Sequence, residues 1–254
     1  MRKPAFAAVL PRGDWHDVLC ARDGLALGRL PAGARVGVGS PVAAAQLRAL
    51  RPDLSVVGVR GTVAGRLGRV LGPRPDLDAV VVGAADLTLA GRDDAATDVL
   101  DDLLPAPAQG VLAIECRHDA DLLEALAELD DPDTRFAAAA ELGVAATLGA
   151  GTLVGALCIR RGSRIGLAVK VLSPDGTRVA GRSVEATPDD DPDDLGRRTA
   201  RLLLAGGAAE VVGHQSATRQ PDSPAAAGRA VPVVFPRLPH DAHWVVFTTP
   251  VAVS

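Results

Sequence analysis

The sequence predicts an α/β protein in which a parallel or mixed sheet in the first half of the chain is followed by a smaller, helix-covered antiparallel sheet. Two observations predict this fold class. Within residues 35–71, two short apolar runs each lead into a glycine-containing turn and then into a helical pattern, the order typical of βα units. Within residues 154–185, strand-like runs flank the turn sequence SPDG, which is typical of an antiparallel hairpin.

The first βα unit has a short β-branched strand at residues 36–38, then Ser40 as a helix cap and Pro41 at the first helical position. Proline suits that position because its missing N–H would have no partner there in any case. The second unit repeats the plan with a strand at residues 55–59 and a helix at residues 63–71. The two helices are therefore expected to begin on the same side of the sheet.

Two helix N-termini on one side of a sheet favour anions, because their free N–H groups and the positive ends of their dipoles meet there. Arg60 and Arg66 add guanidinium groups at this edge, next to Ser40 and Thr62. The pattern predicts a crevice that binds carboxylates or phosphates. The alternative is structural, since every doubly wound domain has such an edge and arginines that flank a helix are more often solvated.

The remaining elements follow from the same signals of period, turn residues and caps. Further strands are predicted at residues 5–10, 76–82, 111–116, 154–160, 165–172 and 177–185, further helices at 120–129, 134–148 and 195–204, and a helix with a loop at 86–104.

Composition excludes several classes of function. The chain has 254 residues, 48% hydrophobic and 23% charged, which is enough material for real cores. Its 27 Lys and Arg residues are spread out against 31 Asp and Glu, and aromatic residues make up only 2%, so no nucleic-acid-binding surface is expected. Three distant cysteines predict neither a zinc site nor disulfides, and no stretch is long enough to span a membrane. The expected location is the cytoplasm.

Several segments, quoted in chain order, resemble hydroxymethylbilane synthase, also called porphobilinogen deaminase. They include AAVLPRGDWHDVLC, VVGVRGTVAGRLGRV, LLPAPAQGVLAIECR and LDDPDTRFAAAAELG, and the resemblance runs from about residue 7 to about residue 207. It implies a lobe like those of periplasmic binding proteins, followed by an α+β domain with a small antiparallel sheet. It also implies a cytoplasmic protein of porphyrin biosynthesis.

The resemblance implies a division into domains. Residues 1–16 and 105–130 are expected to be a remnant of the family's first domain, 17–104 its second, 131–207 its third, 208–230 a linker and 231–254 a tail. The tail weakly resembles uroporphyrinogen III synthase, and a terminal hairpin that packs on the third domain is the alternative. Most of the first domain, with its catalytic aspartate, is expected to be missing. The remnant is therefore expected to self-associate or to need a complementing N-terminal chain.

The family joins four porphobilinogen molecules on a dipyrromethane cofactor held by a cysteine thioether. The resemblance implies that Ser40, Arg60, Thr62, Arg66 and Gln109 contact the ligand or cofactor. Thr152 stands at the position of the attachment cysteine, so no cofactor is expected, and no catalytic residue can be assigned. Val42, Ala43 and Leu89 replace three further arginines of the family.

Three interpretations of function remain open. The first is a diverged protein without the cofactor that binds or processes a small carboxylated pyrrole such as porphobilinogen. The second is an active hydroxymethylbilane synthase, with or without a separate N-terminal chain. The third is a non-catalytic binding protein or a decayed gene product. Whether the protein is an enzyme is left open at this point.

Overall fold

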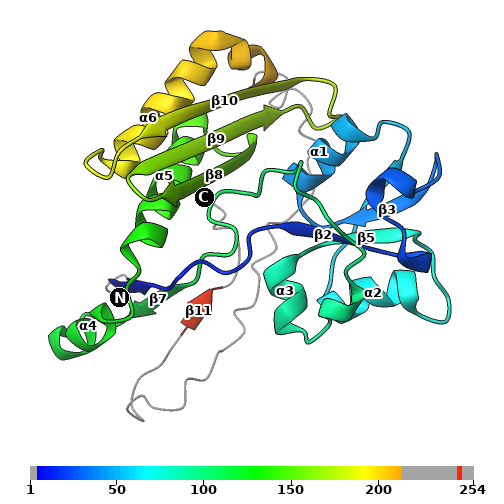
Figure 1. Cartoon of the computed structure of the whole chain (residues 1–254), viewed down its shortest axis with the longest axis horizontal. Helices are drawn as coiled ribbons and strands as arrows, with labels where there is room; N and C mark the ends of the chain where they lie inside the picture. The colour runs from blue at the N-terminus through cyan, green and yellow to red at the C-terminus, as the bar shows by residue number, and fades with distance from the viewer. Residues whose placement is uncertain (1–4, 213–244, 248–254) are drawn as a thin grey trace.

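Three β-sheets organise the chain in a computed structural model that describes residues 5–212 and 245–247 (Figure 1). The helices are α1 Pro41–Leu50, α2 Val63–Leu71, α3 Ala84–Leu89, α4 Ala120–Ala127, α5 Pro132–Leu148 and α6 Pro192–Leu203. The strands are β1 Ala5–Val9, β2 Asp17–Ala21, β3 Arg35–Val38, β4 Ser55–Gly58, β5 Ala79–Gly83, β6 Asp98–Val99, β7 Ala113–Cys116, β8 Leu153–Arg161, β9 Arg164–Leu172, β10 Val179–Ala186 and β11 Val245–Phe247.

The largest sheet has five strands in the order β4-β3-β5-β2-β6. Strand β3 is parallel to β4 and β5, whereas β2 is antiparallel to β5 and β6, so the sheet is mixed and the predicted α/β class is confirmed. Buried clusters cover both faces, with Leu47 of α1 in one cluster and Leu67 of α2 and Leu87 of α3 in the other. Figure 1 shows α1 on one side of this sheet and α2 and α3 on the other.

The second sheet is an antiparallel meander in the order β10-β9-β8, covered by α5 and α6. The two helices approach closely because Gly143 and Gly196 carry no side chains at their crossing. The turn between β9 and β10 contains Gly176, whose φ is +76°, and it lies against α1 of the first sheet. Arg48 of α1 donates from Nη1 to the carbonyl oxygen of Pro174 at 3.0 Å, which fastens the two sheets together.

The third sheet has three strands in the order β1-β7-β11, and α4 covers one face of it. Its core consists of Ala8, Ile114, Cys116 and Leu126. In addition to β1, β11 from the C-terminal tail pairs antiparallel with β7, so a third strand of the same chain joins the remnant of the first domain. The pairing also differs from the alternative in which the tail packs on the third domain.

Three segments differ from the predictions, and one of them is β6, which lies in the stretch 86–104 predicted as a helix with a loop. Strand β2 was not predicted, because all five of its residues are buried and no alternation of apolar and polar residues marks it. Residues 208–212 continue the helical structure after α6, so the predicted linker at 208–230 does not begin at residue 208. The rest of that linker, and the tail apart from β11, lie outside the described residues. The helices that the structure describes include none that is long and apolar enough to cross a membrane.

Candidate functional site

The turns after β3 and β4 bring two helix N-termini together at one edge of the five-stranded sheet. Ser40 caps α1 by accepting a hydrogen bond at Oγ from the backbone N–H of Ala43 at 3.3 Å. Thr62 caps α2 in the same way, with Oγ1 accepting from the N–H of Gly65 at 3.1 Å. Since each hydroxyl uses a lone pair for its cap, its hydrogen can be donated to a ligand. The βα units and the cap at Ser40 were predicted from the sequence, whereas the cap at Thr62 is seen only in the structure.

Arg66 belongs to α2, and its side chain extends along this edge to Gly39 in the turn after β3. A side-chain carbon at Gly39 would lie 3.1 Å from Nη1 of Arg66, so the absence of a side chain at residue 39 makes room for the guanidinium group. Nε of Arg66 is buried and has no hydrogen-bond partner, the one such side-chain atom among the residues with described side chains. A buried donor without a partner costs about 1–3 kcal/mol. An anion that accepts a hydrogen bond from Nε would remove this cost, so Arg66 is a candidate anion-binding residue.

Arg60 is exposed in the turn that leads into α2, directly before Gly61, whose φ is +105°. The structure therefore gathers Ser40, Arg60, Thr62 and Arg66 along two adjacent turns. Two positions where the resemblance implies a replaced arginine differ in exposure. Ala43 lies on the buried face of α1, whereas Leu89 is 67% exposed at the end of α3.

Gln109 lies apart from these four residues, in the segment before β7, and its side chain reaches the start of β2. Its Nε2 donates to the backbone oxygen of Trp15 at 2.9 Å and to Oδ1 of Asp17 at 3.1 Å, and its Oε1 accepts from the N–H of Ala106 at 3.3 Å. The amide thus ties together the two segments that cross between the sheets, residues 10–16 and 105–112. Asp17 faces Gly83, the last residue of β5, in the pairing of β2 with β5, so Gln109 still lies at the same edge of the sheet as the crevice.

Asp17 is a titratable group that sequence reasoning missed. Its residue is 8% exposed, and burial raises the pKa of the carboxyl to about 6, while the hydrogen bond from Gln109 opposes this rise and the nearby Asp86 adds to it. From the sequence, Asp17 is only known to follow a loop, and this position does not indicate that its carboxyl group is buried.

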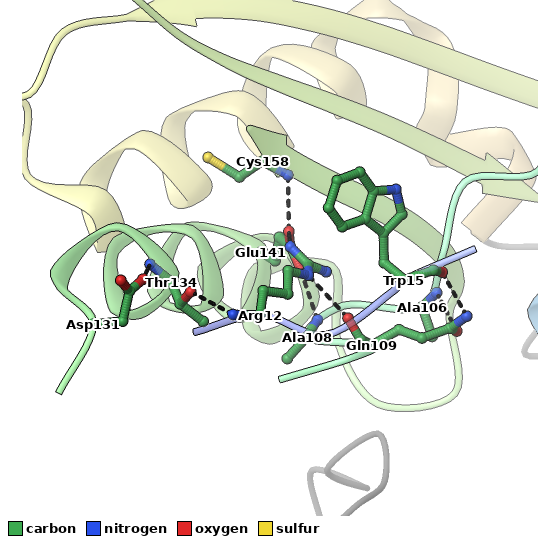
Figure 2. Close-up of polar contacts among 9 residues, drawn as sticks. All are labelled: Arg12, Trp15, Ala106, Ala108, Gln109, Asp131, Thr134, Glu141 and Cys158. Carbon is green, nitrogen blue, oxygen red and sulfur yellow. Dashed lines mark hydrogen bonds and ion pairs between the residues drawn. The ribbon is translucent and has the colours of Figure 1, made fainter. Parts of the chain in front are cut away.

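A buried ion pair joins the first crossing segment to α5 (Figure 2). Nη1 and Nη2 of Arg12 donate to the two carboxylate oxygens of Glu141 at 2.6 and 3.1 Å, and Nε of Arg12 donates to the backbone oxygen of Gln109 at 3.0 Å. Glu141 also accepts from the N–H groups of Ala108 and Cys158 at 2.7 and 2.8 Å. Desolvation raises the pKa of Glu141, against the charge of Arg12 and these hydrogen bonds. The carboxylate therefore connects both crossing segments to β8.

Thr152 lies in the loop after α5, which contains two glycines with positive φ, Gly149 and Gly151. Its Oγ1 donates to the carbonyl oxygen of Leu148 at 3.0 Å. Cys158 is buried in β8, and burial raises the pKa of its thiol to about 12, so it is no nucleophile near neutral pH. The residues that the structure describes include no group of three or more His, Cys, Asp or Glu placed to hold a metal ion.

Comparison with known proteins identifies the family. A model described as "Porphobilinogen deaminase, dipyromethane cofactor binding domain" matches residues 2–125. The chain is 47% identical over 227 residues to the porphobilinogen deaminase of Nocardia farcinica, a match that covers 84% of this chain and 65% of the relative. It is 42% identical to the porphobilinogen deaminases of Acidothermus cellulolyticus over 230 residues and Corynebacterium diphtheriae over 216 residues. These matches cover 87% and 83% of this chain and 68% and 72% of the two relatives. The chain thus spans about two thirds of their length.

These findings correct two expectations. The prediction that no cofactor belongs here is contradicted, because the matching model is that of the family's dipyrromethane-binding domain. The interpretation as a diverged protein that has left the parent reaction is not supported, because identities of 42–47% to proteins named for that activity favour the active enzyme. By sequence, coverage and fold class together, the chain belongs to the porphobilinogen deaminase family of tetrapyrrole biosynthesis.

Proposed function

We propose that the chain acts as a porphobilinogen deaminase, joining porphobilinogen molecules into a linear polypyrrole with release of ammonia. Each porphobilinogen carries an acetate and a propionate group, so the substrate and every intermediate are polyanions. The protein needs fixed positive groups that face a site open to solvent. The edge formed by the turns after β3 and β4 supplies such groups.

The unpaired Nε of Arg66 is the observation that carries this proposal. A carboxylate that accepts from Nε and one Nη atom would form the two parallel hydrogen bonds typical of arginine–carboxylate pairs. The same carboxylate would satisfy a donor that is buried and unpaired in the structure. The hydroxyl groups of Ser40 and Thr62 and the N-terminal N–H groups of α1 and α2 provide further donors for a second carboxylate.

The dipyrromethane cofactor fits this site in one respect and not in another. Its acetate and propionate groups match the donors around Arg66, and when bound the group supplies the pyrrole end that the substrate extends. A thioether cannot form at Thr152, because the hydroxyl is no thiol. We therefore assign the carboxylate groups of the pyrroles to the crevice and route no catalytic step through residue 152.

Arg66→Met tests the proposal, because methionine keeps an apolar stem and removes the guanidinium group. Wild-type protein is expected to consume porphobilinogen and release ammonia, and the variant is expected to bind porphobilinogen about tenfold or more weakly, which corresponds to about 1.4 kcal/mol. Calorimetric titration at low salt measures the affinity, and an ammonia assay measures turnover.

Arg69→Met is the matched control, because Arg69 lies one turn further along α2 and pairs with Asp76 outside the crevice. This variant should bind porphobilinogen as tightly as wild type. Equal affinities of wild type and Arg66→Met, with unchanged urea midpoints for both, would refute the assignment of the crevice. Absence of ammonia release from wild type would refute the activity.

A further inference from the structure

The edge of the five-stranded sheet that carries Arg66 continues onto the ends of two further strands. Strand β3 pairs with β5 in parallel, so the turn at Gly39 lies beside the end of β5. Strand β5 ends at Gly83, which faces Asp17 at the start of β2. Because neighbouring strands lie about 4.8 Å apart, Gly39 and Asp17 are roughly 10 Å apart along this edge, within reach of one small molecule.

Two carboxyl groups lie on the same side of this part of the edge. Residues that face each other in an antiparallel pair project to the same side of a sheet, so the side chain of Asp17 points where a side chain at Gly83 would point. A side-chain carbon at Gly83 would lie 3.6 Å from Oδ2 of Asp86, which places this second carboxyl group beside the first. Their repulsion is one cause of the raised pKa of Asp17.

The ion pairs that the described residues form include none with Asp17 or Asp86. Gln109 donates to Oδ1 of Asp17 from a neutral amide. The imidazole of His16 lies nearby, and its Nδ1 is 2.6 Å from Oδ1 of Asp14. A positive charge between two neighbouring carboxylates relieves their repulsion and favours their charged forms, so this part of the edge favours a cation.

We infer that Asp17 and Asp86 bind the protonated aminomethyl group of porphobilinogen and thereby select pyrroles that carry an ammonium group as well as carboxylates. The inference rests on the proposed function and deepens it. A primary ammonium group donates three hydrogen bonds and carries the positive charge that the two carboxylates favour. Ammonia leaves from this aminomethyl group, so the two side chains would hold the substrate by the group that it loses.

The charges along the edge give the substrate one orientation. Arg60 and Arg66 lie on the side of β4 and β3, whereas Asp17 and Asp86 lie on the side of β2 and β5. The buried, unpaired Nε of Arg66 indicates a ligand on this edge independently of the carboxylates. The acetate and propionate groups are therefore assigned to the arginine side and the aminomethyl group to the aspartate side. The reverse orientation would place carboxylate against carboxylate.

Two ligands test the inference: porphobilinogen, and the analogue in which a methyl group replaces the aminomethyl group. In calorimetric titrations at low salt, wild type should bind porphobilinogen about tenfold more tightly than it binds the analogue. Asp17→Asn and Asp86→Asn should each bind porphobilinogen about fivefold more weakly than wild type, because an amide oxygen accepts a hydrogen bond but carries no charge. Both variants should bind the analogue at least as tightly as wild type does.

Asp121→Asn is the matched control for Asp86→Asn, because Asp121 is also an exposed carboxylate in the first turn of a helix, α4 of another sheet. It should leave both affinities unchanged, and Arg66→Met should weaken the binding of both ligands equally. Equal binding of the two ligands by wild type, or an unchanged porphobilinogen affinity in both aspartate variants, would refute the inference and leave the proposed function intact. Binding of neither ligand by wild type would refute the proposed function and this inference with it.

Discussion

The five-stranded sheet and the β1-β7-β11 sheet are built on related plans but are covered to different extents. Buried clusters lie on both faces of the first, whereas the described residues give the second one small cluster, which consists of Ala8, Ile114, Cys116 and Leu126 of α4. A sheet covered on both faces holds its strand ends in place, so the turns after β3 and β4 can present groups such as Arg66 in fixed positions. Within the described part of the chain, the second sheet has a much smaller core, so it depends more on the pairing of its strands.

Removal of Arg12 should have the largest effect, because the Arg12–Glu141 pair fastens both crossing segments to α5 and β8. Arg12→Met leaves a buried carboxylate without its counter-ion and should lower the free energy of unfolding by about 4 kcal/mol. Desolvation already raises the pKa of Glu141, so the loss should grow as the pH rises and the carboxyl must ionise without Arg12. Urea unfolding at pH 5 and pH 8 measures both effects.

Two variants serve as comparisons for Arg12→Met. Arg12→Met/Glu141→Met should recover most of the loss, because an apolar pair of similar volume removes the unpaired charge. Arg160→Met, which breaks the exposed pair with Asp133, should cost at most about 1 kcal/mol. A loss of that small size for Arg12→Met would show that the buried pair does not hold the sheets together.

Leucine truncations compare the two cores directly. Leu47 and Leu126 are both fully buried, the first on α1 in a core cluster of the five-stranded sheet and the second on α4 in the small cluster. Leu47→Ala should lower the free energy of unfolding by about 3 kcal/mol, and Leu126→Ala by less, because the small core can relax around the missing atoms. Urea unfolding measures the totals. Hydrogen exchange should show lost protection only in β1, β7 and α4 for Leu126→Ala, and protection lost throughout that variant would contradict this comparison.

Asp17→Asn should stabilise the five-stranded sheet and so increase the difference in stability between the two sheets. Because the pKa of Asp17 is raised to about 6, the folded chain holds the proton more tightly than the unfolded chain, and stability falls as the pH rises from about 4 to about 6. Asparagine carries no proton to lose and still accepts from Gln109. The variant should gain up to about 3 kcal/mol at pH 7.5 and little near pH 4, measured by urea unfolding. Asp102→Asn, at an exposed residue, is the control, and an equal gain in both variants would argue against burial as the cause.

Local patterns in the sequence predicted the helices and turns of the candidate crevice better than they predicted the contacts that support it. The βα units, the cap at Ser40 and the position of Arg66 follow from short-range signals of period and turn residues. The Arg12–Glu141 pair joins residues 129 positions apart, and no local pattern carries that information. Gln109 was assigned to the ligand by resemblance, and its amide is engaged between Trp15, Asp17 and Ala106 in the structure. A ligand contact by Gln109 stays a prediction.

The tail shows the same limit. Val245, Val246 and Phe247 have the composition of a strand, and the sequence indicated a strand near them. Their partner β7 lies far earlier in the chain, and strand propensity does not select a partner. Strand β2 was missed for a related reason, because a fully buried strand lacks the alternation by which a half-buried strand is identified.

Gly176 has a consequence for how the sequence can change over time. A side-chain carbon at this residue would lie 2.7 Å from the backbone of α1 at Ala45 and Ala49, and its φ of +76° already disfavours other residues. A longer turn or a larger residue there would press on α1, whose N-terminus forms part of the crevice. Substitutions in the β9–β10 hairpin and on the facing side of α1 are therefore expected to arise together in descendants of this protein, as linked changes in two segments more than a hundred residues apart.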